Sequence, residues 1–136
     1  MGKLIKGIHH IALKCQGVEA FEKTVEFYRD VLGLEVARTW GEGETFGIMF
    51  ETGSGLLEIF ANAPDALPQG TIRHFALATD DVDACIETVR KAGYQVTTEP
   101  KDICIGSVPP FPARIAFCIG PVGEKIEIFC EKSPVG

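Results

Sequence analysis

The chain of 136 residues has no long apolar run and no excess of basic residues, and each absence excludes a class of protein. A transmembrane helix needs about 18 consecutive apolar residues, and no stretch comes near that length. The first residues also lack the apolar segment of a signal peptide. Lys and Arg number 13 against 19 Asp and Glu, and the net charge of −6 argues against non-specific nucleic-acid binding, which relies on neutralising phosphates. We therefore expect a cytoplasmic protein with neither a nucleic-acid nor a membrane partner.

The cysteine pattern is equally restrictive. The five cysteines are odd in number and widely spread, and none belongs to a Cys-x-x-Cys motif. This pattern favours free thiols in a reducing compartment over a disulfide framework or a zinc knuckle. We interpret the cysteines as small, buried hydrophobic residues.

An internal repeat is the most informative feature. HIAL at residues 10–13 recurs as HFAL at 74–77, and EIF at residues 58–60 recurs at 127–129. Each half of the chain would bury too little apolar surface to be stable alone, whereas the whole chain, with 46% hydrophobic residues, can form one core. We expect a single domain over residues 1–136, made of repeat modules at residues 7–62 and 71–131 that pack together.

The first module predicts one helix and four strands. The helix begins at Gly17, because apolar residues recur at spacings of three and four from Val18 to Leu32, and Gly33 is suited to end it. A Gly-Ser-Gly turn at residues 53–55 indicates a hairpin between the last two strands. Strands are predicted over residues 8–14, 34–39, 46–52 and 56–61.

The second module predicts the same order after a connector with Pro and Gly at residues 63–70. Asp80 and Asp81 are candidate N-caps of its helix, and Gly93 is suited to end it. Strands are predicted over residues 72–78, 94–98, 113–119 and 125–131. Residues 106–112 contain three prolines, and we predict a loop there, acting as a lid over a pocket. The fold class is α+β, with two βαβββ modules.

Strand alternation places the repeated histidines and glutamates on equivalent faces. Apolar residues flank Glu58 and Glu127 in their strands and suit the helix-covered face, so the two carboxylates point the other way. His10 and His74 also fall on the faces away from the helices. His9 has the opposite parity and matches Arg73 in the repeat, so we expect it to be structural or to support the ligands.

Four such side chains can bind one divalent metal ion if they converge. Taken singly, each histidine is more often structural and each glutamate more often solvated, but their joint repetition favours a metal site. Imidazole and carboxylate ligands suit Ni, Co, Mn, Fe(II) or Zn, and the absence of thiolate argues against a structural zinc site. Four ligands leave two open positions in an octahedron, as in a catalytic metal site.

These motifs resemble the vicinal oxygen chelate superfamily, which includes glyoxalase I, methylmalonyl-CoA epimerase, extradiol dioxygenases and bleomycin-resistance proteins. The resemblance rests on the repeated HhAL and EIF motifs and on YRDVLGL at residues 28–34, and it covers residues 6–131. It implies curled mixed sheets that form a half-open barrel around the metal. In this family the two half-sites come from one chain or from a symmetric pair of chains; we expect a homodimer, and the sequence does not choose between the two arrangements. Within the family the ligand set is similar to that of glyoxalase I, which implies the metal ligands His10, Glu58, His74 and Glu127.

The implied chemistry moves a proton next to a carbonyl group through a metal-stabilised enediolate. In glyoxalase I this converts the hemithioacetal of methylglyoxal and a thiol into a lactoyl thioester. The resemblance implies Glu127 as the base, with Glu58 as ligand or second base.

Substrate contacts are the least constrained part of the site. Arg38 occupies a place similar to a glutathione-contacting arginine of glyoxalase I, although a surface arginine is the alternative. Trp40, Phe60, Phe111 and Phe129 are candidates for the wall of an apolar pocket, with core packing as the alternative. Two other functions stay open: an epimerase or isomerase of an acyl-CoA or keto sugar at the same metal, and a non-catalytic small-molecule binding or resistance protein. Metal content and proton exchange distinguish the binding protein, and thiol dependence distinguishes the two enzymes.

Overall fold

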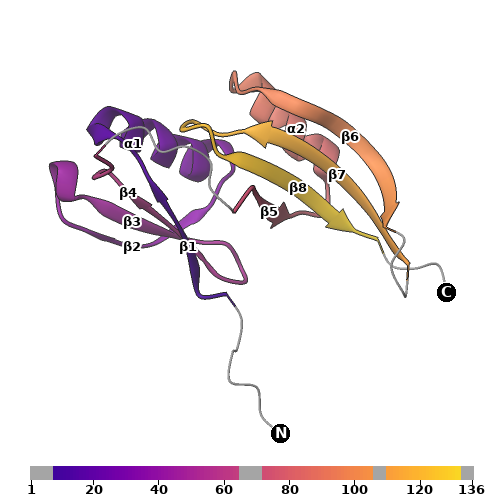
Figure 1. The fold of residues 1–136 in the computed structure, drawn as a ribbon, viewed down its shortest axis with the longest axis horizontal. Coiled ribbons are helices and arrows are strands. Elements are labelled where there is room, and N and C mark those ends of the chain that lie inside the picture. Colours follow the sequence, from indigo (N-terminus) through magenta and orange to yellow (C-terminus); the bar gives the residue numbers. More distant parts are fainter. Residues whose placement is uncertain (1–7, 65–71, 106–109, 133–136) are drawn as a thin grey trace, which may run out of the picture. The chain divides into compact units, whose positions relative to one another are not determined.

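The computed structural model describes residues 8–64, 72–105 and 110–132 (Figure 1). The chain divides into two compact units, residues 1–68 and 69–136. The connector predicted at residues 63–70 and the loop predicted at 106–112 fall largely outside the described residues. None of the described helices has the length and apolar character needed to cross a membrane.

The first unit contains a mixed four-stranded sheet in the order β1-β4-β3-β2. β1 pairs with β4 in parallel, and the other two pairs are antiparallel. The helix α1 lies over one face of this sheet (Figure 1). The elements are β1 (His10–Lys14), α1 (Gly17–Glu26), η1 (Phe27–Val31), β2 (Glu35–Trp40), η2 (Gly43–Thr45), β3 (Gly47–Glu51) and β4 (Leu56–Phe60). The βαβββ order predicted for this half is confirmed.

The second unit repeats this topology with the strand order β5-β8-β7-β6. β5 pairs with β8 in parallel, and the remaining pairs are antiparallel. Its elements are β5 (Phe75–Ala78), α2 (Val82–Lys91), β6 (Val96–Ile105), β7 (Phe111–Ile119) and β8 (Lys125–Glu131). The fold class predicted from the sequence, α+β with two modules and mixed sheets, is therefore confirmed.

Each unit has its own core between its helix and one face of its sheet. In β4 the side chains of Leu57 and Ile59 are 2% and 0% exposed, and in β8 those of Ile126 and Ile128 are 0% and 2% exposed. Full burial of each such side chain contributes about 1.5–3 kcal/mol. Because these residues alternate with Glu58 and Glu127, the core fixes which face of each sheet carries the carboxylates.

The end of the first helix differs from the prediction. A regular helix was expected up to Leu32, but α1 ends at Glu26 and a π-helical turn follows. In that turn the N–H of Leu32 donates to the carbonyl of Phe27 at 2.9 Å, five residues back. Phe27 and Tyr28, the first two residues of this turn, are both fully buried. Gly33 follows with a φ of +76°, as expected for the glycine that ends the segment.

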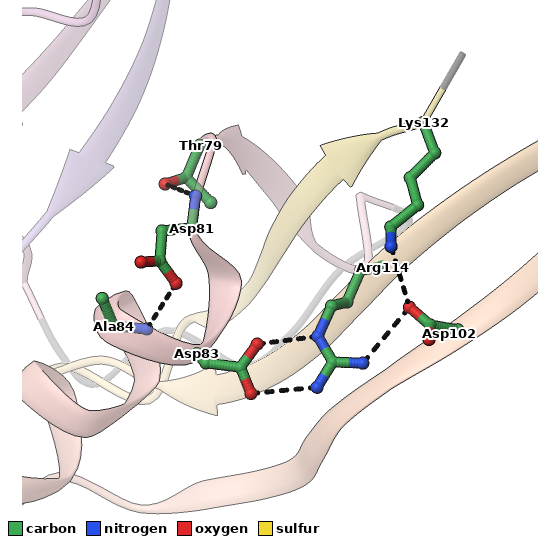
Figure 2. A network of polar contacts seen from close by, with 7 residues as sticks. All are labelled: Thr79, Asp81, Asp83, Ala84, Asp102, Arg114 and Lys132. Carbon is green, nitrogen blue, oxygen red and sulfur yellow. Dashed lines mark hydrogen bonds and ion pairs between the residues drawn. The ribbon is translucent and has the colours of Figure 1, made fainter.

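The second helix is held by polar contacts at its start (Figure 2). Asp81 caps it, because its Oδ1 accepts the N–H of Ala84 at 3.0 Å, which confirms one of the two candidate caps. In the first turn, Asp83 accepts two hydrogen bonds from Arg114 of β7 at 2.7 and 2.9 Å. Arg114 also donates to Asp102 of β6 at 3.2 Å. The guanidinium therefore links the helix to two strands, and it lowers the pKa of both carboxyl groups.

The loop prediction is wrong at residues 111–112. Phe111 and Pro112 belong to β7, where they pair with Ile105 and Cys104. The carbonyl of Pro112 accepts a hydrogen bond from the N–H of Lys132, the residue that follows the end of β8. In an antiparallel pair the N–H of a residue points to the same side as its carbonyl, so the N–H that proline lacks would also lie beyond the end of β8. Proline is tolerated there because no ladder hydrogen bond within β8 is lost. Residues 106–109 lie outside the described part of the chain.

All five cysteines are free thiols, as expected. Cys15 and Cys118 are buried, and burial raises the pKa of the Cys118 thiol to about 11. The expectation of burial is wrong for Cys104, which is exposed on the edge strand β6.

Candidate metal centre

His10 and Glu58 form a pair in the first unit. His10 is the first residue of β1, and Glu58 lies in the middle of β4, opposite Ala12 in the parallel register. Because Ala12 and His10 are two residues apart, both side chains lie on the face away from the core. The Nε2 of His10 lies 3.6 Å from Oε1 of Glu58, with side-chain exposures of 41% and 12%.

His74 and Glu127 form the equivalent pair in the second unit. His74 immediately precedes β5, and Glu127 in β8 lies opposite Ala76, again two residues after the histidine. The Nε2 of His74 lies 3.2 Å from Oε1 of Glu127, and the exposures are 40% and 14%. The register, the separation and the burial of the first pair are thus nearly reproduced.

The donor chemistry of both pairs fits a divalent ion. Two atoms that each bind one ion at about 2.1 Å, about 90–110° apart, lie about 3.0–3.4 Å from one another. The separations of 3.6 and 3.2 Å are within a few tenths of an ångström of that spacing. Within the described residues neither carboxylate has a Lys or Arg as ion-pair partner, although both are largely buried. A bound cation would offset the cost of burying these charges.

The four predicted ligands are present as two pairs, one in each unit. In residues 8–64, 72–105 and 110–132, no group of three or more His, Cys, Asp and Glu side chains gathers as a metal site. A centre that uses all four ligands is therefore a proposal, and the equivalence of the two pairs supports it.

Arg38 shares a cross-strand row with Glu58. Arg38 of β2 lies opposite Met49 of β3, and Met49 lies opposite Glu58. The Nη1 of Arg38 donates to the sulfur of Met49 at 3.4 Å, and a thioether is a weak acceptor. In the described part of the chain Arg38 forms no ion pair, so its charge is available to an anion. Arg38, a predicted substrate contact, thus lies on the face that carries the histidine and the glutamate.

Aromatic pairs occupy the next positions along both faces. Trp40 and Phe60 lie with ring centroids 5.8 Å apart in the first unit, and Phe111 and Phe129 have the same separation in the second. Phe60 and Phe129 are each two residues after the glutamate of their pair, so they share its face. Between the strands of Trp40 and Phe60, Gly47 makes room for the indole, because a Cβ there would lie 2.3 Å from the ring. All four rings are partly exposed, as the wall of a binding surface would be.

The prediction missed two residues beside the second pair. Phe117 lies opposite Glu127, and its ring packs against that of His74 in a T-shaped arrangement with a centroid distance of 5.5 Å. The ammonium group of Lys125 lies 4.7 Å from the centre of the Phe117 ring, a cation–π contact. Lys125 could have been found from the sequence, since it is two residues before Glu127 in the same strand. Phe117 required the antiparallel register, which the sequence alone did not provide.

Comparisons with known proteins agree with this fold. The family model "Glyoxalase/Bleomycin resistance protein/Dioxygenase superfamily" matches residues 7–128. A lactoylglutathione lyase of Haemophilus influenzae is 34% identical over 120 residues, covering 82% of this chain and 85% of that protein. A probable lactoylglutathione lyase of Vibrio cholerae is 29% identical over 132 residues, covering 91% and 92%. A mutant of glyoxalase I from Zea mays has a TM-score of 0.71 and 24% identity, over 90% of this chain and 44% of its own. The chain belongs to the glyoxalase/bleomycin resistance protein/dioxygenase superfamily.

Proposed function

We propose that this protein is a metal-dependent lyase or isomerase, similar to glyoxalase I, that moves a proton at a carbon next to a carbonyl group. One observation carries the proposal: each unit holds a His–Glu pair with nearly the same separation, 3.6 and 3.2 Å, and nearly the same exposure. Two relatives, one named lactoylglutathione lyase at 34% identity and one named probable lactoylglutathione lyase at 29% identity, support the same type of reaction.

The proposed metal ligands are His10, Glu58, His74 and Glu127. Imidazole nitrogen and carboxylate oxygen suit Ni, Co, Mn, Fe(II) or Zn, and the two carboxylates offset the charge of a divalent ion. When bound, such an ion would act as a Lewis acid toward the negative charge that develops on the substrate oxygens.

In the proposed reaction, Glu127 takes the proton from the substrate carbon and returns it to the neighbouring carbon. A carboxylate can do both, since its ionised form accepts a proton and its neutral form donates one. Glu58, in the equivalent position, serves as a ligand or as a second base. The choice of Glu127 follows the resemblance to glyoxalase I.

The residues beside the two pairs are suited to an anionic substrate with an apolar part. Arg38 carries a charge that no described carboxylate neutralises, and Trp40 and Phe111 are partly exposed aromatic rings on the two units. We propose that these residues contact the substrate, that the active form is a homodimer, and that it works in the cytoplasm, where the five free thiols stay reduced.

Exchange of the transferred proton tests this function. The protein is loaded with Ni, Co, Mn or Zn and incubated in D2O with the hemithioacetal of methylglyoxal and glutathione, or with acyl-CoAs and keto sugars. We expect thiol-dependent formation of the lactoyl thioester with deuterium at the carbon that receives the proton. Exchange confined to an acyl-CoA or a keto sugar would instead indicate an epimerase or isomerase. Absence of exchange with every substrate and metal would contradict the proposal and favour a binding protein.

A further inference from the structure

His9 lies against the proposed ligand His10 in an arrangement that strand alternation does not predict. Its Nδ1 lies 2.9 Å from Nδ1 of His10, and the two rings meet edge to face with centroids 5.2 Å apart. Alternation would send neighbouring side chains to opposite faces, but β1 begins at His10, so His9 is outside the pleated strand.

The backbone of His9 is held in place by the start of β4. The N–H of Leu56 donates to the carbonyl of His9 at 2.9 Å. A Cβ on Gly55 would lie 2.8 Å from the carbonyl oxygen of Ile8, so only glycine allows the chain to approach this closely. The position of His9 is thus built into the turn between β3 and β4.

The contact between the two rings has a definite chemical meaning. A hydrogen bond between two Nδ1 atoms contains one proton, carried by one of the rings. The Nε2 of His10 faces Glu58 at 3.6 Å, which is longer than a hydrogen bond. For Nε2 to bind a metal ion it must carry no proton, and a neutral imidazole then carries its proton on Nδ1. That proton must be donated to His9.

We propose that His9 is a positioning residue for the metal site, which accepts the Nδ1 proton of His10. By doing so it fixes the orientation of the His10 ring and the tautomer that presents Nε2 beside Glu58. This inference rests on the proposed metal-dependent function. Partners of this kind, behind a metal-bound histidine, typically change metal affinity by about 10–100-fold when they are removed.

The second unit holds its histidine in another way. Arg73 occupies the position before His74, where the first unit has His9. Glu124 lies three residues before Glu127, as Gly55 lies three residues before Glu58. Within the described residues no hydrogen bond reaches Nδ1 of His74, whose ring packs against Phe117. The role proposed for His9 therefore belongs to the first unit only.

Zinc affinity of three proteins tests the proposal: the wild type, His9→Phe and His9→Asn. Phenylalanine keeps a ring but accepts no hydrogen bond, whereas the amide oxygen of asparagine can accept one from near the place of Nδ1. We expect zinc binding, measured by competition with a chromophoric chelator, to weaken about 10–100-fold in His9→Phe. In His9→Asn the affinity should return to within a few-fold of the wild type. Thermal unfolding of the metal-free proteins checks that all three are folded.

A spectroscopic readout accompanies the affinities. In the zinc-loaded wild type with 15N-labelled histidine, the NMR spectrum should show the His10 proton on Nδ1 and protected from exchange. That protection should be lost in His9→Phe and kept in His9→Asn.

Three results would overturn the proposal, and they differ from one another. Unchanged zinc affinity in His9→Phe would remove the positioning role and leave the metal site intact. Equal losses in His9→Phe and His9→Asn would mean that His9 does not act by accepting a hydrogen bond from His10. A wild-type protein that binds no zinc, nickel, cobalt or manganese would contradict the metal-dependent function and this inference with it. If the zinc affinities follow the expected order, weakened in His9→Phe and restored in His9→Asn, but no substrate exchanges a proton, the proposed reaction alone would be contradicted.

Discussion

The two units hold the same pair of side chains in different surroundings. In the first, His10 is hydrogen-bonded to His9, and Arg38 shares the cross-strand row of the glutamate. In the second, His74 lies against the ring of Phe117, over which the charge of Lys125 is placed. The repeat thus retains the candidate metal donors and varies the groups that lie beside them.

The helices of the two units also differ in the contacts that hold them against their sheets. α1 has no side-chain cap at its start and ends in the turn that buries Phe27 and Tyr28. α2 begins with the Asp81 cap and is tied to the sheet through Asp83 and Arg114 (Figure 2). The first helix is therefore anchored by apolar burial, and the second also by charge. Each difference between the units can be tested by changing one unit and using the other as its control.

The largest effect is expected when the two glutamates are replaced one at a time by glutamine. Glutamine keeps an oxygen that can coordinate a metal but is not a base, so Glu127→Gln should keep much of its metal and lose at least about 100-fold in turnover. Glu58→Gln, the matched change in the other unit, should be milder. Metal analysis and turnover numbers provide the check. A nearly normal Glu127→Gln with an inactive Glu58→Gln would reverse the assignment of the base, and two unaffected variants would rule out the proton-transfer mechanism.

A smaller effect is expected at Arg38. Arg38→Met removes a charge-assisted hydrogen bond to the proposed anionic substrate, worth about 1.5–3 kcal/mol, so KM should rise about tenfold or more with little change in kcat. Thr98 occupies the same row in the second unit, opposite Phe117, and Thr98→Val serves as the control. Equal KM values for both variants and the wild type would show that Arg38 does not contact the substrate.

Gly47→Ala should disturb the aromatic pair of the first unit. The added methyl group would overlap the ring of Trp40, and because that ring is partly exposed it can move away from Phe60. We expect the free energy of unfolding to fall by about 1 kcal/mol, at the low end of the range for overpacking. The fluorescence of Trp40, the single tryptophan of the chain, should shift. Phe60→Leu removes the partner ring without crowding and should shift it in the same direction. An unchanged spectrum in both would contradict the described packing.

The smallest effect should be that of the ionic contacts of the second unit, and it should depend on pH. Hydrogen bonds from Arg114 lower the pKa of Asp83 and Asp102. Their stabilising contribution is therefore complete above the pKa of an unfolded aspartate, about 3.9, and is lost as the pH falls through the lower folded-state values.

Melting temperatures of Arg114→Met and the wild type, measured between pH 7 and pH 2.5, test this dependence. The variant should melt slightly lower at pH 7, and the difference should shrink below about pH 4. Arg29→Met is the control, because Arg29 pairs with the adjacent Asp30 and joins no separate elements. A difference that persists unchanged in acid would mean that Arg114 stabilises the unit by packing alone.

Local patterns in the sequence were sufficient to predict the order of the elements and the face of each donor, whereas the mixed sheets were implied by the resemblance to a known family. The alternation around Glu58 and Glu127 predicts which side of the strand is buried, and the exposures of Leu57 and Ile128 agree. The order βαβββ follows from turn signals such as Gly53 to Gly55, which lie between apolar segments.

Features that depend on neighbouring strands, on a wider helical turn or on the exact start of a strand could not be predicted. The π-helical turn at Phe27 changes the hydrogen-bond ladder without any change in the apolar spacing. Pro112 indicated a loop, because the sequence does not show that its missing N–H faces past the end of β8. The contact of His9 with His10 depends on where β1 begins, and strand boundaries are weakly encoded in local sequence.

The stoichiometry of metal binding tests most directly whether the two equivalent pairs are halves of one centre. Wild-type protein, His10→Ala and His74→Ala are titrated with zinc, and bound metal per chain is measured after dialysis. We expect about one ion per chain in the wild type, and an affinity more than about 100-fold weaker in each variant, because each loses a ligand of the same site. Two ions in the wild type with one remaining in each variant would show independent sites. Full occupancy in the variant that carries both substitutions would contradict the ligand assignment altogether.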